Sequence, residues 1–137
     1  MTAESCTGGG IAAALTAISG SSAVFKGGIV SYTNDVKVSQ LSVDADLIRR
    51  VGPVSAEVAE AMAIGARENL CADVAVSVTG LAGPTGDDYH NPVGTVYVGF
   101  SDRDKSFSRR FFFFGDRESI RRQAVKAALE IVLESSG

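Results

Sequence analysis

The sequence predicts an α/β domain with a mixed β-sheet and helices on both faces. Segments rich in β-branched and aromatic residues alternate along the chain with segments whose apolar residues recur every three to four positions. No internal repeat and no linker-like stretch divides the 137 residues. A single domain of this length buries roughly 70% of the surface of its unfolded chain. We therefore expect one domain, residues 1–137, around one compact core.

Each expected element has its own signal. The predicted strands are bounded by turn residues and cover 2–4, 25–33, 73–80, 93–102 and 105–114. The predicted helices cover 10–18, 46–51, 55–70 and 116–135, and a further short helix after Asn34 carries Val36, Lys37 and Leu41. Asn34, Ser55 and Asp116 are expected as helix N-caps because their side chains accept backbone hydrogen bonds. The last two strands should form a hairpin across residues 102–105.

Composition excludes several classes of function. The net charge of −3 argues against non-specific nucleic-acid binding, which depends on clustered Lys and Arg. No apolar run approaches the roughly 18 residues of a membrane span, and no signal peptide opens the chain. The two cysteines, Cys6 and Cys71, are too few and too far apart for a disulfide framework. We expect a cytoplasmic, reduced protein.

Elimination also narrows the chemistry. Neither G-x-G-x-x-G nor G-x-x-x-x-G-K-[ST] occurs, so a dinucleotide or triphosphate site of the usual kind is not expected. The only histidine, His90, lies in a polar loop, and there is no C-x-x-C, so we expect no metal centre. A serine activated by a lysine remains, which requires a neutral, desolvated amine. Among the lysines, position favours Lys37 over Lys26.

Three loops at predicted strand ends are candidates for the site. They are ESCTGGG (4–10), YTNDVK (32–37) and TGLAGPTGDD (79–88). In α/β sheets ligands bind beyond the carboxyl ends of the strands, where loops lead into helices. Backbone N–H groups of residues 5–9, or of the TGLAG turn at 79–83, are the expected donors to an oxyanion.

Six segments resemble, in order, the CinA C-terminal domain family of nicotinamide mononucleotide deamidases: AESCTGG, GSSAVFKGGIVSYTNDVK, GPVSAEVAEAMA, VSVTGLAGPTG, NPVGTVYVGF and FGDRESIRRQAV. The resemblance implies a three-layer α/β/α sandwich with a mixed, mostly parallel sheet of about five strands. It also implies a serine amidohydrolase with a Ser/Lys dyad, no metal and no cofactor, which converts nicotinamide mononucleotide to nicotinic acid mononucleotide and ammonia. The chain departs from the family at Asn91, where a basic residue is usual. Family members carry a helix and a complete first strand before AESC; because this chain begins MTAES, we expect either a truncated start or a partner chain that covers the sheet there.

Carried over residue by residue, the resemblance assigns the catalytic lysine to Lys37 and the nucleophile to Ser22, with Ser5 as the rival. Ser22 could instead cap a turn, and Cys6 lacks the histidine partner that a thiol nucleophile needs. The expected substrate-binding residues are Thr7, Gly8, Gly9, Tyr32, Asn34, Thr79, Gly80, Gly83, Arg117 and Arg121. The two arginines suit a 5′-phosphate, although a solvated helix face would also explain them.

Two functions remain open at this stage. The first is the deamidase, with nicotinamide mononucleotide as its small-molecule partner. The second is a non-catalytic nucleotide-binding or regulatory module linked to competence and DNA damage. In either case the FFFF segment (111–114) predicts a homo-oligomer, because its outward phenylalanines would form an apolar patch on a monomer.

Overall fold

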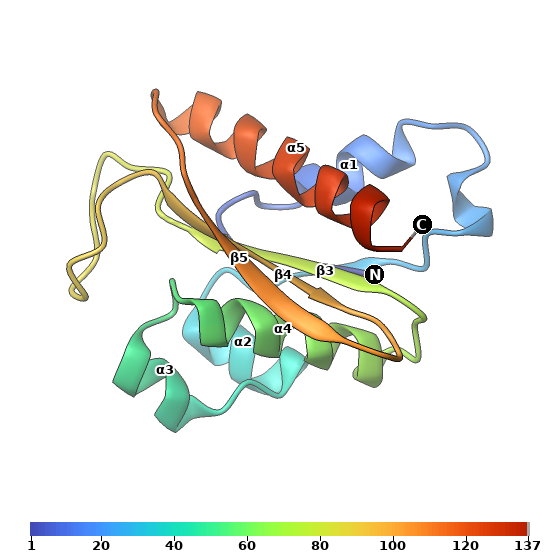
Figure 1. Cartoon of the computed structure of the whole chain (residues 1–137), viewed down its shortest axis with the longest axis horizontal. Coiled ribbons are helices and arrows are strands. Elements are labelled where there is room, and N and C mark those ends of the chain that lie inside the picture. The colour runs from blue at the N-terminus through green and yellow to red at the C-terminus, as the bar shows by residue number, and fades with distance from the viewer. Residues whose placement is uncertain (137) are drawn as a thin grey trace.

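A five-stranded sheet lies between two layers of helices in the computed structural model, which describes residues 1–136 (Figure 1). The strands are β1 (Thr2–Glu4), β2 (Gly28–Val30), β3 (Ala75–Gly80), β4 (Thr95–Ser101) and β5 (Ser106–Phe112). The helices are α1 (Gly10–Thr16), α2 (Asn34–Leu41), α3 (Ala45–Val51), α4 (Ala56–Asn69), α5 (Arg117–Ser135) and a 3₁₀ turn at Ser21–Ala23. Helices α1 and α5 cover one face, and α2, α3 and α4 cover the other (Figure 1). The predicted three-layer sandwich is confirmed.

The strand order is β2-β1-β3-β4-β5. Strand β1 runs parallel to both β2 and β3, whereas β4 is antiparallel to β3 and to β5. The sheet is mixed as predicted, but only two of its four strand pairs are parallel, not the majority that we expected. Because β1, β2 and β3 point the same way, their carboxyl ends meet at one edge of the sheet.

Apolar side chains fill the space on each side of the sheet. The core under α1 and α5 includes Ile11, Val76, Val78, Val96, Val98, Phe100, Ile120, Ala124 and Ile131. The core under α2, α3 and α4 includes Ala3, Leu41, Val43, Ile48, Val58, Met62, Ala66 and Ala75. Two separate cores therefore replace the single core that we expected, because the sheet is buried on both faces.

Strand β5 forms one edge of the sheet, and its phenylalanines alternate in exposure. Phe111 and Phe113 pack against the core, whereas Phe112 and Phe114 are exposed. This is the alternation that the two-residue period of a strand dictates. The subunit interface predicted from this segment stays a prediction.

Gly65 lets α2 lie unusually close to α4. A Cβ atom at Gly65 would collide with the backbone carbonyl of Leu41, the last residue of α2. Since Lys37 lies on α2, this contact also sets how deeply the lysine enters the molecule. The apolar face predicted for the longer helix is confirmed, with Val58, Met62 and Gly65 all buried.

Helix caps agree with the sequence at two places and differ at one. Ser55 Oγ accepts the N–H of Val58 at 3.3 Å, and an Asp116 carboxylate oxygen accepts the N–H of Ser119 at 2.8 Å. Helix α2 begins at Asn34 rather than after it, so Asn34 is not the N-cap that we expected. Strand β2 is also shorter than predicted, because the chain leaves the sheet at Ser31 and turns into α2.

Candidate active site

Ser5 and Lys37 form a hydrogen-bonded pair at the carboxyl edge of the parallel strands. The distance between Lys37 Nζ and Ser5 Oγ is 3.1 Å, and Lys37 Nζ also donates to the backbone carbonyl of Ser31 at 2.9 Å. The exposed fractions of the two residues are 8% for Ser5 and 2% for Lys37. A nucleophile and a base thus lie within proton-transfer distance, shielded from water.

Three elements bring this pair together. Ser5 directly follows β1, and its N–H donates to the carbonyl of Val78 in β3 at 3.0 Å. Lys37 lies in the first turn of α2, after the end of β2. Because β1 and β2 are parallel neighbours, the chain that leaves each strand emerges at the same edge, and the lysine side chain reaches back to the serine.

Burial lowers the pKa of the Lys37 amine. Removal from water lowers the pKa of Lys37 from 10.5 to about 8. A neighbouring thiolate at Cys6 would oppose this effect, but burial raises the pKa of Cys6 to about 11. The thiol is therefore neutral near pH 7, which leaves it a poor nucleophile and leaves the lysine able to act as a base.

A tight turn connects the serine to α1. The N–H of Gly8 donates to the carbonyl of Ser5 at 3.0 Å, and Gly8 and Gly9 adopt φ angles of 58° and 100°. These left-handed conformations favour glycine, which explains why glycines follow the serine. Thr7, Gly8 and Gly9 thus shape the turn, and none of them lines the cavity in front of Ser5.

Glu4 holds this turn from inside. Its carboxylate accepts the hydroxyl of Thr7 at 2.6 Å and the N–H groups of Ile11 and Ala12 at 2.8 and 3.0 Å. The residue is 1% exposed. The sequence patterns assign no role to Glu4. The one sequence signal for a role of Glu4 is its position directly before Ser5. The N–H groups that it accepts in α1 belong to residues seven and eight positions later, and no local motif predicts such a contact.

A cavity of about 260 Å³ opens in front of the pair. Most of the expected binding residues line it: Tyr32, Asn34, Thr79, Gly80, Gly83 and Arg117. Pro53 and Thr85 also line it and were not among the expected binding residues, although Thr85 belongs to the candidate loop 79–88. The volume suits part of a small organic molecule with the rest in solvent.

Arg117 lies at the mouth of this cavity. It donates to the carbonyl of Gly83 at 2.7 Å and to the Tyr32 hydroxyl at 3.1 Å, so it links three separate segments of the cavity wall. Arg121 lies elsewhere. Its guanidinium donates to the carbonyls of Cys6 and Thr7 at 3.0 and 3.2 Å, and it does not line the cavity.

Ser22 does not meet Lys37 in this chain. It is exposed, lies in the 3₁₀ turn, and is absent from the cavity that holds Lys37. The amine of Lys37 instead contacts the hydroxyl of Ser5, the residue that we had placed second. The signal that could have reversed the choice is the end of β1 at Glu4, because parallel neighbours β1 and β2 deliver Ser5 and Lys37 to one edge.

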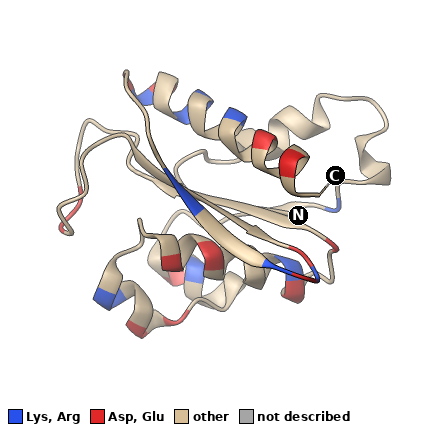
Figure 2. Cartoon of the chain, in the orientation of Figure 1, with Lys and Arg blue, Asp and Glu red and all other residues tan. Residues whose placement is uncertain are grey.

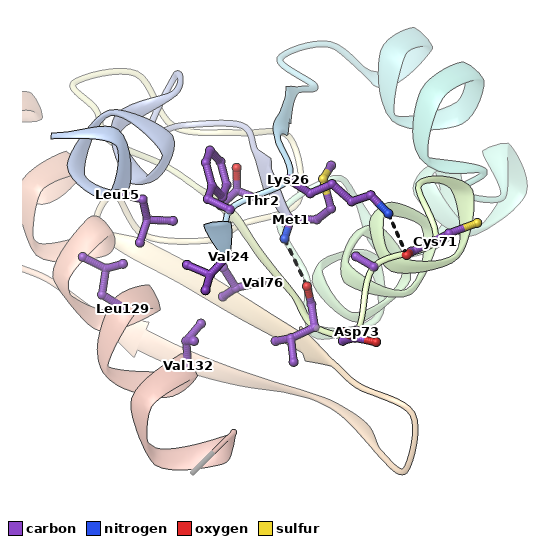
Figure 3. A pocket seen from close by; sticks show the side chains of 13 residues that line it. Met1, Thr2, Leu15, Val24, Lys26, Cys71, Asp73, Val76, Leu129 and Val132 are labelled. Carbon is purple, nitrogen blue, oxygen red and sulfur yellow. Dashed lines mark hydrogen bonds between the residues drawn. The ribbon is translucent and has the colours of Figure 1, made fainter. Parts of the chain in front are cut away.

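A larger cavity, of about 350 Å³, lies at the opposite end of the parallel strands (Figure 3). Its walls are largely apolar and include Leu15, Val76, Leu129 and Val132. The lysine at this cavity, Lys26, donates to the backbone carbonyl of Cys71 at 3.0 Å rather than to a hydroxyl group. Polar groups of a nucleophile and a base converge in the smaller cavity, so we place the chemistry there.

Within residues 1–136 no group of three or more His, Cys, Asp or Glu side chains could hold a metal ion. No helix in that part of the chain is long and apolar enough to cross a membrane. His90 is exposed and does not line the cavity, so it has no part in the Ser5–Lys37 pair.

Comparison with known proteins then decides the family, because residues 1–136 match the model of the CinA C-terminal domain. The chain belongs to the CinA C-terminal domain family. Solved structures agree: a CinA superfamily protein from Escherichia coli has a TM-score of 0.94 and 38% identity over 97% of this chain and 77% of its own. The competence/damage inducible protein CihA from Agrobacterium tumefaciens has a TM-score of 0.95 and 42% identity over 99% and 84%.

Curated relatives carry several kinds of name, nicotinamide-nucleotide amidohydrolase and CinA-like protein among them. Nicotinamide-nucleotide amidohydrolase PncC of Pseudomonas putida is 52% identical over 133 residues, which cover 97% of this chain and 83% of that protein. A CinA-like protein of Citrifermentans bemidjiense is 52% identical over 128 residues, 93% of this chain. The chain spans about three tenths of that longer relative, 31% of its length.

Proposed function

We propose that this CinA-family chain is an amidohydrolase that deamidates nicotinamide mononucleotide to nicotinic acid mononucleotide and ammonia, with Ser5 as nucleophile and Lys37 as base. The observation that carries the proposal is the distance of 3.1 Å between Lys37 Nζ and Ser5 Oγ, inside a cavity of about 260 Å³. The Pseudomonas putida relative, named as a nicotinamide-nucleotide amidohydrolase, supports the choice of substrate.

The first half-reaction needs one proton carrier. Neutral Lys37 takes the proton of Ser5 Oγ as the oxygen attacks the carboxamide carbon, which forms the O–C bond and places a negative charge on the carbonyl oxygen. Collapse of this intermediate breaks the C–N bond. The Lys37 ammonium then gives its proton to the departing nitrogen, which leaves as ammonia.

The second half-reaction uses the same groups in the same order. Lys37 takes a proton from water, the resulting hydroxide attacks the ester carbon, and the bond to Ser5 Oγ breaks. The proton returns to Ser5, so the net reaction consumes one water and releases the acid and ammonia. The carbonyl of Ser31, 2.9 Å from Lys37 Nζ, holds the amine in place throughout.

Negative charge on the intermediate requires donors. Neither the N–H of Cys6 nor that of Thr7 has an acceptor within residues 1–136, and Cys6 lines the cavity beside Ser5. We assign the Cys6 amide, which lies at the cavity, to the oxyanion. Loss of one such donor typically costs 10²–10³-fold in turnover, about 3–4 kcal/mol.

Charge along α5 suits an anionic substrate. Its N-terminal half carries Arg117, Arg121 and Arg122, and its C-terminal half carries Glu130 and Glu134 (Figure 2). Glu118 and the Asp116 cap agree with the helix dipole, which favours acidic residues at the N-terminus, whereas the three arginines and the two C-terminal glutamates oppose it. Of the three arginines only Arg117 lines the cavity, so we assign the phosphate of the nucleotide to Arg117.

Ammonia release from nicotinamide mononucleotide tests the proposal. We expect turnover by the unmodified chain and by Ser22→Ala, and a loss of at least about 10³-fold for Ser5→Ala. Ser22→Ala is the matched control, because it removes the same hydroxyl from the exposed 3₁₀ turn. Absence of turnover by the unmodified chain, with saturable nucleotide binding, would overturn the proposal in favour of a binding module.

A further inference from the structure

The guanidinium of Arg121 donates hydrogen bonds to the backbone of the turn that follows Ser5. Nε donates to the carbonyl of Cys6 at 3.0 Å and Nη2 donates to the carbonyl of Thr7 at 3.2 Å, across more than 110 residues of sequence. The residue is half-buried and lies outside the cavity of Ser5 and Lys37. These bonds occupy the Nε–Nη2 edge of the guanidinium, one of the two edges through which an arginine can bind a phosphate bidentately.

The bond to the Cys6 carbonyl fixes a peptide plane. In a trans peptide the C=O of one residue and the N–H of the next point in opposite directions. With the carbonyl of Cys6 held by Arg121, the N–H of Thr7 is turned away from the guanidinium. Rotation of this peptide would break the hydrogen bond to Arg121 and reverse the N–H.

The amides of this turn are costly to leave unpaired. Cys6 and Thr7 are 6% and 1% exposed, and neither N–H has an acceptor within the described part of the chain. A buried donor without a partner costs about 1–3 kcal/mol. Arrangements of this kind persist where a ligand or a transition state supplies the missing acceptor.

The turn is held from its other side as well. The Glu4 carboxylate accepts a hydrogen bond from the Thr7 hydroxyl at 2.6 Å and caps α1. Thr7 is therefore held by Glu4 through its side chain and by Arg121 through its carbonyl. Gly8 leaves room for the guanidinium, since a Cβ atom there would lie 3.2 Å from Arg121 Nη2. A larger residue at this position would displace the guanidinium by a few tenths of an ångström and would itself be strained at a φ of 58°.

We propose that Arg121 is a positioning residue, which holds the turn of residues 5–8 so that the Cys6 N–H at the cavity serves the oxyanion, and that it does not bind the substrate phosphate. This inference rests on the proposed amidohydrolase function. It separates two arginines that share one helix: Arg117 lines the cavity, and Arg121 acts through the backbone next to the nucleophile.

Kinetics on two substrates test the inference. Arg121→Met is compared with Arg122→Met, which removes a charge from the exposed neighbouring position. The substrates are nicotinamide mononucleotide and nicotinamide riboside, which lacks the phosphate. We expect kcat to fall about 10²-fold for both substrates in Arg121→Met with KM within about twofold, and Arg122→Met to match the unmodified chain. Arg121→Lys should recover part of kcat, because an ammonium can donate to one of the two carbonyls.

A raised KM confined to the mononucleotide, with kcat unchanged, would overturn the inference and return Arg121 to the phosphate. A second readout does not depend on turnover. The ¹H–¹⁵N cross-peaks of Cys6 and Thr7 should move in Arg121→Met and stay in Arg122→Met; unmoved peaks in folded Arg121→Met would also overturn it. If the unmodified chain releases no ammonia, the proposed function fails, while the cross-peaks still decide whether Arg121 holds the turn.

Discussion

Two lysines flank β2, Lys26 before the strand and Lys37 on the helix that follows it, and they differ in burial and in hydrogen-bond partner. Lys26 precedes the strand, is exposed, and donates to the carbonyl of Cys71. Lys37 follows the strand, is 2% exposed, and lies 3.1 Å from the hydroxyl of Ser5. The comparison teaches that burial and a hydroxyl partner together make a lysine a base; neither the residue type nor proximity to a cavity does so.

The cavities beside the two lysines teach the same lesson. The cavity at Lys26 is the larger, about 350 Å³ against about 260 Å³, and its walls are largely apolar. The smaller cavity brings together a serine, a buried lysine and an arginine. Convergent polar groups, more than volume, locate chemistry in a molecule of this size.

The largest expected effect comes from exchanging each lysine for methionine. Lys37→Met should reduce ammonia release from nicotinamide mononucleotide by about 10³-fold, because it removes the proton carrier of both half-reactions. Lys26→Met should stay within about twofold of the unmodified chain. Initial rates at one pH measure both. Equal losses in the two variants would break the contrast between the lysines.

The pH dependence of kcat/KM sharpens the contrast further. The reaction needs the neutral amine, and burial lowers the pKa of Lys37 to about 8. The rate should therefore rise about tenfold per pH unit below pH 8 and level off above it, a gain of about 10²-fold between pH 6 and pH 9. A buffer series on the unmodified chain and on Ser22→Ala should give the same curve. A profile that is flat or falls over this range would contradict the role of Lys37.

Arg117→Met tests the charge at the mouth of the smaller cavity. We expect KM for nicotinamide mononucleotide to rise about 10- to 30-fold, the loss of a charge-assisted hydrogen bond, while KM for nicotinamide riboside changes little. Steady-state kinetics on the two substrates separate these effects. A similar rise for both substrates would mean that Arg117 only supports the Gly83 and Tyr32 walls.

The smallest expected effect is on stability. A fall in pKa from 10.5 to about 8 means that folding disfavours the charged amine, at a cost of about 3 kcal/mol below pH 8. Because the unfolded chain binds the extra proton between pH 8 and 10.5, this cost shrinks as pH rises through that window. Lys37→Met should therefore stabilise the fold by ~1–2 kcal/mol at pH 7, after loss of the bond to Ser31. Urea unfolding at pH 7 and pH 10 measures the difference; a gain that persists at pH 10 would contradict this origin.

Much of the fold was predictable because its signals are local. The caps at Ser55 and Asp116 and the hairpin of β4 and β5 follow from side chains within a few residues of each feature. The short length of β2 was not predictable, since the strand covers only the three residues that pair with β1. Parallel pairing of β1 with β2 and β3 likewise depends on contacts far apart in sequence.

The candidate site divides in the same way. The choice of Lys37 came from the residues and from the family resemblance, and the structure places it in the cavity. The preference for Ser22 over Ser5 does not fit the geometry, because strand order, which no local pattern encodes, delivers Ser5 to the amine. The roles of Glu4 and Arg121 could not be predicted from the sequence for the same reason. Their hydrogen-bond partners are backbone groups, or lie far away along the chain.

The central claim is that Ser5 carries the acyl group, and trapping that group tests it most directly. The chain would be mixed with nicotinamide mononucleotide, quenched in acid within one turnover, digested, and read by fragmentation mass spectrometry that separates Ser5 from Ser21 and Ser22. The account predicts an ester on Ser5 that is absent in Ser5→Ala and in Lys37→Met. An ester on Ser22, with Ser5 unmodified, would contradict it.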